Sequence, residues 1–512
     1  MSAEMTVQGK QTKRLDVILS IGLGVCALLL CLCRLSIYPS PWFDEGLNLQ
    51  AAKNIAVHGQ YGLRSGNDFT EFDPAIQTGP TVLLPIAWLF HVAGIGILQA
   101  RLVAVSYTVL ALVVFYWLVH SVYDRKVAVL ASLLLLFTFD HEFTSFVSMG
   151  RQVLGEVPAL AFFWLGTLLW LKALPDARPP ALSGAGILWG LALLTKVQFA
   201  MILPVALFLF WVLDRVSGKR LRLREVVVPL VVCGLCVLAW YGYQALSLGF
   251  AHFRQQMSAL GVGGGMHFLH FAYRRSGNAI ADLAGSTLFI LGLPGMLYAT
   301  VADLQDRRKG YNQLFLVVFS AVWLGWYAFL SIGWIRYAFV PAAISAIFSA
   351  RLLGDLWHEC GRHGQALSHR FPVTSVQLAV GGMMVMVLLS GILPMSKEII
   401  FSPDGGLQKL ADYLNTYIPK DAVIESWEWE VDVLTDHIYH HPPYAITNVY
   451  TEHVWYNTSI SVAMYDPMAA GPSYLIVGSF AKWTGIYSPI LLEQRCTPVQ
   501  SIGEYDLYEL NR

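Results

Sequence analysis

The stretch PTVLLPIAWLFHVAGIG, residues 80–96, decides how this chain is threaded through a membrane. It is apolar enough to be taken for a membrane span, but it is shorter than the roughly 20 residues that a spanning helix needs. It also contains Pro80, Pro85, Gly94 and Gly96. A short apolar run with prolines and glycines suits an interfacial or re-entrant element better than a straight span. We therefore expect residues 80–96 to stay on one side of the membrane.

The composition of the whole chain indicates a polytopic α-helical membrane protein. Of its 512 residues, 56% are hydrophobic and 13% are charged, whereas about 25% of the residues in a typical soluble domain are charged. The formal net charge is zero, so nothing in the charge suggests that the protein binds nucleic acid. The position of each charge along the chain is therefore more informative than the total.

The other apolar runs predict about eleven crossings. They lie near residues 16–35, 99–120, 127–139, 157–171, 182–213 (a hairpin, counted as two), 226–246, 283–302, 313–330, 337–350 and 375–393. Cytoplasmic loops carry the excess of Lys and Arg. The basic stretches at residues 10–14, 125–126, 172–178, 215–224, 307–309 and 351–370 all fall on one side under this count. If residues 80–96 also crossed, Arg125 and Lys126 would face outward.

The two ends of the chain are expected on opposite sides of the membrane. Basic residues precede the apolar run 17–32, which has no small-residue cleavage site, so we expect a retained first helix and a cytoplasmic N-terminus. An odd number of crossings then places the C-terminal part outside. We expect the protein in the inner (plasma) membrane of a prokaryotic cell.

The sequence predicts two domains. Residues 1–395 form the transmembrane domain, whose first outer loop, residues 37–97, is expected to carry interfacial helices. Hydropathy falls after Leu393, and short β-like runs at residues 422–426, 474–479 and 505–510 alternate with polar turns. Residues 396–512 therefore read as a small extracytoplasmic α/β domain. It holds 15 Asp or Glu against six Lys or Arg, as expected of a translocated segment.

Two adjacent carboxylates, Asp44 and Glu45, follow the first span in the sequence PWFDEG, residues 41–46. We expect them at the outer membrane surface. The surroundings of an interfacial carboxylate can tune it to act as a general base or as a metal ligand. A solvated turn with two acids is the plain alternative.

A second acidic position is Glu156, at the expected outer end of a span. An ionisable residue at the edge of a span is costly and is therefore a functional candidate. Under the crossing count it lies on the same side as Asp44. Asp140 and His141, at the other end of the same loop, are further candidate metal ligands beside Asp44 and Glu156; an ordinary interfacial turn is the alternative for them.

Four cations are expected on the outer side, against the usual bias: Lys196, Arg336, Arg274 and Arg275. One explanation is that they bind a phosphate, since Arg makes bidentate contacts and Lys acts as a point charge. Snorkelling to the interface is the alternative for each of them alone. The sequence has no P-loop, nucleophile-elbow or zincin motif.

Several short motifs occur in an order that resembles the GT-C superfamily of membrane glycosyltransferases, specifically its protein O-mannosyltransferase-like and aminoarabinose-transferase-like branch. These are Asp44-Glu45, Asp73-Pro74 to Pro80, Arg101-Leu102, Gly150-Arg151 to Glu156, Leu194-Thr195-Lys196, Trp240-Tyr241 and Arg336-Tyr337. The chain departs from the usual pattern in two places. Glu156 stands where Asp is common, and Asp73-Pro74-Ala75 replaces His-Pro-Pro.

The resemblance implies a GT-C fold and an inverting transfer of one sugar, outside the cytoplasm, from a polyprenyl-phosphate donor to an acceptor hydroxyl. Asp44 would be the general base, and Glu45 and Glu156 would position the acceptor or a divalent ion. Lys196 and Arg336, with Arg274 and Arg275, would hold the donor phosphate. The acceptor, which is a protein, a lipid or a glycan, and the metal dependence stay open. Membrane lipid is a further expected partner.

Two other classes of protein fit the composition. A transporter or lipid flippase would need polar residues through the middle of the membrane, often with an internal repeat. A receptor or scaffold would use the acidic tail to bind partners. The sequence WEWE at residues 427–430 is the nearest thing to the WWDYG-type motif of oligosaccharyltransferases, another branch of the superfamily, and is interpreted as unrelated to it.

Overall fold

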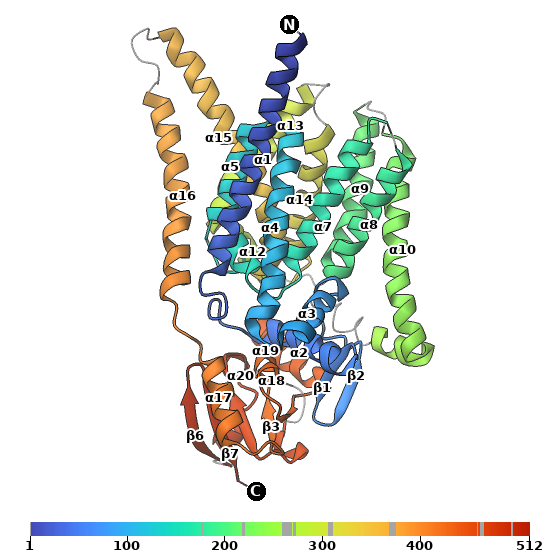
Figure 1. Ribbon diagram of the computed structural model, residues 1–512, viewed down its shortest axis with the longest axis vertical. Coiled ribbons are helices and arrows are strands. Elements are labelled where there is room, and N and C mark those ends of the chain that lie inside the picture. The colour runs from blue at the N-terminus through green and yellow to red at the C-terminus, as the bar shows by residue number, and fades with distance from the viewer. Residues whose placement is uncertain are drawn as a thin grey trace.

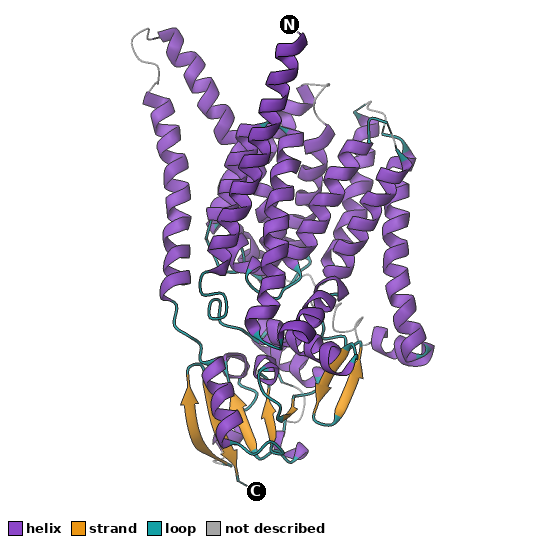
Figure 2. Cartoon of the chain, viewed as in Figure 1, coloured by secondary structure: helices purple, strands orange, loops and turns teal. Residues whose placement is uncertain are grey.

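The structure is a computed structural model. It describes residues 2–176, 178–217, 221–258, 269, 273–305, 311–367, 375–457, 459–460, 465–492 and 495–511. Two parts are visible in it: a tall bundle of helices, and a smaller domain with a sheet at one end (Figure 2). The N-terminus lies at the far end of the bundle, and the C-terminus lies at the tip of the sheet domain (Figure 1).

Each of the expected crossings coincides with a helix. The bundle helices are α1 (Ser2–Leu32), α4 (Ile97–Val122), α5 (Arg125–Phe137), α7 (Glu156–Ala173), α8 (Pro179–Thr195), α9 (Gln198–Val216), α10 (Leu223–Leu248), α13 (Thr287–Gln305), α14 (Tyr311–Phe329), α15 (Phe339–Leu367) and α16 (Ser375–Phe401). Among the described residues, seven helices are long and apolar enough to cross a membrane, or eight if α12 (Tyr273–Gly285) and α13, bent by 90°, count as one span. The fold class is confirmed, and the number of crossings stays a prediction.

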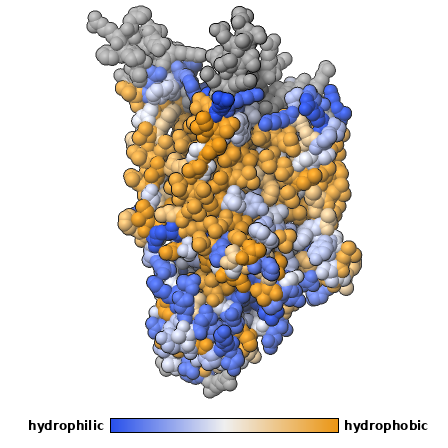
Figure 3. All heavy atoms as spheres, in the orientation of Figure 1, coloured by the Kyte–Doolittle hydropathy of each residue, from blue (hydrophilic) through white to orange (hydrophobic). Residues whose placement is uncertain are grey.

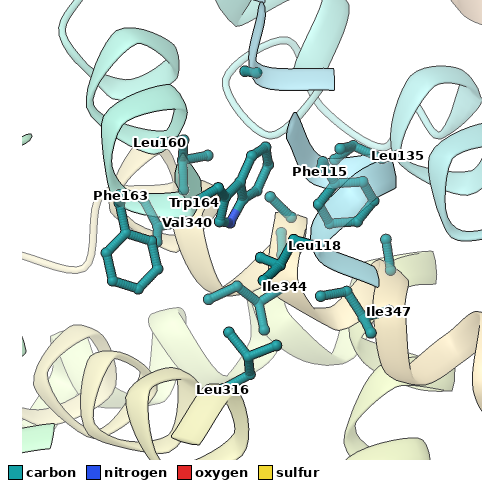
Figure 4. Packing of buried hydrophobic residues seen from close by; sticks show 14 of the residues in the cluster. Phe115, Leu118, Leu135, Leu160, Phe163, Trp164, Leu316, Val340, Ile344 and Ile347 are labelled. Carbon is teal, nitrogen blue, oxygen red and sulfur yellow. The ribbon is translucent and has the colours of Figure 1, made fainter. Parts of the chain in front are cut away.

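The bundle is held together by close packing of apolar side chains at its centre. Figure 4 shows Trp164 and Leu160 of α7 beside Val340 and Ile344 of α15, with Phe115 of α4 opposite. All five side chains are buried. Apolar side chains also cover most of the face of the bundle seen in Figure 3, and hydrophilic ones gather toward its two ends. Such a surface suits a bilayer, in which van der Waals packing replaces the hydrophobic effect between helices.

The run at residues 80–96 lies at one end of the bundle (Figure 1); that it stays on one side of a membrane remains a prediction. It forms the short helix α3 (Pro80–Ala93), which ends at Gly94 with φ +83°. Figure 1 shows α3 beside α2 (Phe43–His58), at the end of the bundle that carries the sheet domain. The hairpin of β1 (Gly62–Ser65) and β2 (Asp68–Glu71) lies at the same end.

Close contact between α3 and the end of α8 depends on a glycine. The amide of Gly79 donates to the carbonyl of Thr195 at 3.3 Å, and the hydroxyls of Thr81 and Thr195 lie 2.6 Å apart. A Cβ at Gly79 would lie 1.5 Å from the carbonyl oxygen of Leu194. This contact fixes the position of the residue that follows α8, which is Lys196.

The C-terminal domain contains a five-stranded mixed sheet in the order β4-β3-β5-β7-β6. The strands are β3 (Val423–Ser426), β4 (Ile438–His440), β5 (Tyr474–Val477), β6 (Cys496–Ile502) and β7 (Tyr505–Leu510). β3 runs parallel to β4 and β5, and β7 is antiparallel to β5 and β6. The helices are α17 (Leu407–Tyr417), α18 (Trp429–Val433), α19 (Tyr444–Tyr456), α20 (Ser479–Thr484) and α21 (Ser488–Leu492). The small α/β domain expected from the sequence is therefore present.

The domain docks on the bundle through α2 and α18. A Cβ at Gly46 of α2 would lie 2.2 Å from the backbone nitrogen of Glu430, so the two helices approach closely because Gly46 has no side chain. The covalent link is α16, which continues to Phe401 and thus past residue 395, where the sequence suggests the domain boundary. Arg34, just after α1, donates to the carbonyls of Ile399 and Ser402 at the end of α16, at 3.2 and 2.8 Å.

Candidate active site

Asp44 and Glu45 lie in the first turn of α2, which begins after Trp42 in an extended conformation. Carboxylates in the first turn are favoured there because the helix dipole and the unpaired amides attract negative charge. Asp44 is 8% exposed and Glu45 is fully buried. The alternative of a solvated turn therefore does not describe this segment.

Glu45 is part of a buried ion pair with Arg101 of α4. The guanidinium donates from Nε to Oε1 at 2.8 Å and from Nη2 to Oε2 at 2.5 Å. The amide of Val153 also donates to Glu45 Oε1, at 3.0 Å, and Arg101 Nη1 donates to the carbonyl of Leu35, at 2.8 Å. Glu45 thus ties α2 to α4 and to the loop before α7.

Asp44 belongs to a cluster of two carboxylates and two cations that the fold brings together from four segments. Arg336 lies in the short 3₁₀ helix η1 (Ile335–Ala338), Glu156 is the first residue of α7, and Lys196 follows α8. Arg336 donates to Glu156 from Nε and Nη2, at 2.7 and 3.0 Å, and from Nη1 to Asp44. Lys196 Nζ lies 2.9 Å from Glu156 Oε1. The formal charges of the four groups sum to zero.

Two indole rings hold the Arg336 guanidinium in place. Its central carbon lies 5.6 Å from the ring centre of Trp42 and 5.1 Å from that of Trp334, within the range of a cation–π contact. Trp42 Nε1 in turn donates to Gln152 Oε1 at 2.7 Å. Trp42, two residues before Asp44, therefore helps to hold Arg336 in place, and Arg336 pairs with Asp44.

A cavity of about 840 Å³ opens beside this cluster. Its lining includes Asp44 and Lys196, whereas Glu45, Glu156 and Arg336 lie behind the wall. One side is formed by the segment after β2, residues 72–79, and by Trp240 and Tyr241 of α10. The opposite side comes from the C-terminal domain. A carboxylate and an ammonium thus face the same enclosed space.

The C-terminal domain contributes Trp427, Trp429, His440 and His441 to the cavity. His440 Nδ1 lies 2.5 Å from Oε2 of the buried Glu425, and this contact raises the pKa of His440. His441 Nδ1 lies 2.6 Å from the carbonyl oxygen of Ser426. Its ring stacks on Trp429 with centroids 3.7 Å apart, and burial lowers the pKa of His441 to about 4.

Sequence reasoning missed these four residues as part of the site. It interpreted WEWE as unrelated to the WWDYG-type motif of oligosaccharyltransferases, and it did not place His440 or His441 at the site. The available signal was partial: Trp427 and Trp429 follow directly after the expected strand β3, whereas His440 ends β4, which the sequence did not predict and which lies parallel to β3. The carboxyl ends of parallel strands meet at one edge of a sheet, where ligands commonly bind.

The remaining candidates are not brought to the cluster. Asp140 accepts hydrogen bonds from Ser286 Oγ and from the amide of Thr287, at 2.9 and 2.8 Å, and so caps the start of α13. His141 Nδ1 accepts from the amide of Phe143 at 3.1 Å. Arg275 of α12 does not line the cavity. The side chain of Arg274 lies outside the described residues.

The arrangement does not fit a metal ion held by several side chains at once. Among the described residues, no group of three or more His, Cys, Asp or Glu side chains could hold one. Asp44 and Glu156 are instead bonded to Arg336. We therefore derive no chemical step through a metal at this cluster.

One family model and several solved structures match this chain. A family model described as dolichyl-phosphate-mannose-protein mannosyltransferase matches residues 77–242. No curated protein matches the sequence. Structures of ArnT from Cupriavidus metallidurans are similar over 96% of this chain and 97% of theirs: TM-score 0.62 and 13% identity with undecaprenyl phosphate bound, 0.64 and 12% in the apo state.

The oligosaccharyltransferase of Archaeoglobus fulgidus, tethered to an acceptor peptide, is also similar. It has a TM-score of 0.55 and 13% identity over 96% of this chain and 74% of that protein. Identities this low show the fold alone. The bundle and the C-terminal domain thus have the same overall arrangement as in these two proteins.

Proposed function

We propose that this chain, a membrane glycosyltransferase with the GT-C fold, moves one sugar from a polyprenyl-phosphate donor to an acceptor hydroxyl. The transfer takes place on the extracytoplasmic side and inverts the anomeric carbon, with Asp44 as general base. The observation that carries the proposal is that Asp44 and Lys196 face one cavity, with Arg336 and Glu156 directly behind them.

The chemistry follows from this pair of groups. Asp44 accepts the proton of the acceptor hydroxyl as the oxygen attacks the anomeric carbon. The bond from that carbon to the phosphate oxygen breaks on the opposite face, and the lipid phosphate leaves with the electron pair. Lys196 stabilises the phosphate, since an ammonium interacts strongly with an anionic oxygen in a site of low dielectric.

Arg336 and Glu156 act from behind the cavity wall. Arg336 is 2% exposed and Glu156 is 4% exposed. We assign Arg336 to the donor phosphate through its charge, and Glu156 to the orientation of Lys196 and Arg336. Glu45, which does not line the cavity, holds the first turn in place through Arg101. No direct contact of Glu45 or Glu156 with the acceptor is needed.

The donor fits the membrane side of the cavity. Val237, Trp240 and Tyr241 of α10 and Met257 give this side an apolar and aromatic lining. A structurally similar protein, ArnT, was solved with undecaprenyl phosphate, and another, the archaeal oligosaccharyltransferase AglB, with a dolichol phosphate. A donor that carries its own phosphate leaving group needs no nucleotide-binding loop, which agrees with the lack of such a motif in the sequence.

The distribution of charge and the positions of the two chain ends support an extracytoplasmic location of the cavity. The cavity is lined by α2, by the segment after β2 and by the acidic C-terminal domain, which lie together at one end of the bundle, and the N-terminus lies at the other end (Figure 1). Basic segments stay in the cytoplasm. We therefore assign the cavity to the extracytoplasmic face of the inner membrane.

Replacing Asp44 by Asn tests the proposal. The purified variant is incubated with candidate lipid-linked sugars and acceptors, and products are followed by mass spectrometry. We expect transfer to be abolished while expression and donor binding stay near normal, because Asn keeps the shape but cannot take the proton. Asp68→Asn, which also changes a carboxylate of the cavity lining, should keep most of the activity. Full activity of Asp44→Asn would remove the assignment.

A further inference from the structure

Helix α19 of the C-terminal domain presents one face to the large cavity, which we call the α19 face. Its residues are spaced three or four positions apart and so lie on one side of the helix: Tyr444, Thr447, Asn448, Thr451 and Trp455. On the other side of α19, Ile446 and Tyr450 pack into the core of the domain. The α19 face contains no Leu, Ile, Val or charged residue. It therefore suits a neutral polar ligand better than an acyl chain.

A row of tryptophan rings joins the α19 face to the charged cluster. The guanidinium of Arg336 lies 5.1 Å from the ring centre of Trp334, which is 5.9 Å from that of Trp455. Trp455 is in turn 6.3 Å from Trp483, whose side chain is 43% exposed. All three tryptophans line the cavity. The row thus leads from the cation that pairs with Asp44 to the surface of the protein.

Asp73, in the segment after β2, adds a carboxylate to the same part of the cavity. Burial, with a contribution from the Asp73 carboxylate, raises the pKa of Tyr444, so Asp73 lies near the start of α19. Asp73 Oδ1 accepts from the amide of Ala75 at 2.8 Å, and among the described residues no cation pairs with this carboxylate. Asp73, Asn448 and Thr451 are half-buried, and a ligand in the cavity can therefore reach them.

These groups together match the chemistry of a sugar. The hydroxyls of a sugar donate to carboxylate, amide and hydroxyl oxygens, and its C–H faces pack on the electron-rich face of an aromatic ring. About a third of the residues that line the cavity are Phe, Trp or Tyr, against 13% of the whole chain. From Tyr444 to Trp455, α19 is about 16 Å long, which is longer than one sugar ring.

The edge of the sheet beside the cavity does not favour a peptide. Extended peptides often bind by adding a strand to a free sheet edge, and β4 is the edge strand that contributes to the cavity. The turn after β1 already occupies this edge. The amide of Gly66 donates to the carbonyl of Tyr439 at 2.5 Å, and the amide of His441 donates to Ser65 Oγ at 2.9 Å. A further strand therefore cannot pair there.

We propose that the acceptor is an oligosaccharide of two or more sugar units that binds along the α19 face. Asp73, Asn448 and Thr451 accept hydrogen bonds from its hydroxyls, and Trp455 packs against a sugar ring. This assignment rests on the proposed function and deepens it, because it names the class of acceptor whose hydroxyl Asp44 deprotonates.

Binding of the purified full-length protein to a printed array tests the proposal. The protein is fluorescently labelled in detergent and applied, without any donor, to bacterial surface oligosaccharides and to Ser- and Thr-containing peptides on the same array. We expect saturable binding to a subset of the oligosaccharides and none to the peptides. Asn448→Ala and Thr451→Val should each weaken this binding by roughly three- to tenfold, since each removes about one hydrogen bond.

Asn415→Ala is the matched control. It removes an exposed amide of α17 that does not line the cavity and should leave binding intact. The proposal is overturned if no oligosaccharide is bound, if the peptides are bound instead, or if both α19 variants bind as tightly as the unaltered protein. The array requires no sugar transfer. If transfer depends on Asp44 but no oligosaccharide binds, the proposed function stands and only this acceptor is removed.

Discussion

At the scale of single residues, two adjacent carboxylates have opposite surroundings. Asp44 faces the large cavity and pairs with Arg336, while Glu45 points the other way and is enclosed with Arg101. From the sequence, both acids and Arg336 are expected on the outer side, but the two acids are not separated by role. The roles of Asp44 and Glu45 differ because their side chains leave the first turn of α2 in different directions. These directions depend on how α2 packs against α4.

We predict that Glu45→Gln destabilises the protein by about 3–5 kcal/mol, because it leaves Arg101 buried without a counter-charge. Thermal or denaturant unfolding of the detergent-purified protein measures the effect. The paired change Glu45→Leu with Arg101→Met should recover most of the loss, since it removes both charges. If Glu45→Gln lowers transfer but leaves stability unchanged, Glu45 has a chemical role.

His441 makes the stability of the C-terminal domain depend on pH. Burial holds its pKa at about 4, below the roughly 6.5 of an unfolded chain. The stability gained from a neutral His441 is present above pH about 6.5 and is lost as pH falls toward about 4, by up to about 3 kcal/mol. Glu425 raises the pKa of the neighbouring His440, which acts in the opposite direction.

The variant His441→Asn isolates this effect. Asn can keep a donor near the carbonyl of Ser426 but does not titrate. Proteolysis of the domain in increasing urea, at about pH 7 and about pH 5, measures its stability. We expect the unaltered protein to lose more stability than the variant on acidification. Equal losses would show that His441 is not the group responsible.

At the scale of elements, the prediction for residues 80–96 depended on length and on prolines and glycines, and the structure places α3 at one end of the bundle. The strands were predicted less completely. β3, β5 and β7 were expected, whereas β4 and β6 were missed. β4 has only three residues, and β6 is a largely exposed edge strand with Pro498 and an irregular register. Neither strand shows the alternating pattern that marks a half-buried strand.

The contact between α3 and α8 gives a prediction for Gly79. In Gly79→Ala the new methyl group would meet the carbonyl oxygen of Leu194, push α3 away and displace Lys196. Overpacking of this kind typically costs about 1–3 kcal/mol, and we expect sugar transfer to fall by at least tenfold. Gly242→Ala in α10, where a Cβ meets nothing within 4 Å, is the control and should behave normally in both assays. Unchanged transfer in Gly79→Ala would contradict this role of α3.

At the scale of the whole molecule, the GT-C fold and the glycosyltransferase class predicted from the sequence are confirmed. The fold was predictable because the apolar runs that form its helices can be read directly from the sequence. The wall formed by Trp427, Trp429, His440 and His441 was not predictable in this way. It depends on how the C-terminal domain docks on α2, and this docking brings together residues that lie almost 400 positions apart in the sequence.

Sidedness can be tested by labelling introduced cysteines. In a variant without the seven native cysteines, Lys420→Cys marks the C-terminal domain and Arg178→Cys marks the turn between α7 and α8; both positions are exposed. We expect a membrane-impermeant maleimide to label Lys420→Cys on intact spheroplasts and to reach Arg178→Cys only after permeabilisation. The reverse pattern would invert the orientation and place the cavity in the cytoplasm.

The docking of the C-terminal domain also has a consequence for biosynthesis. A ribosome makes the bundle first, and domains generally fold in the order of their synthesis. Asp44, Glu156, Lys196 and Arg336 are therefore in the membrane before Trp427 to His441 are made. Until that later segment has folded, the cavity lacks the side that the C-terminal domain forms. A nascent chain consequently carries the charged cluster without an enclosed site, and so is not expected to consume donor lipid before its translation is complete.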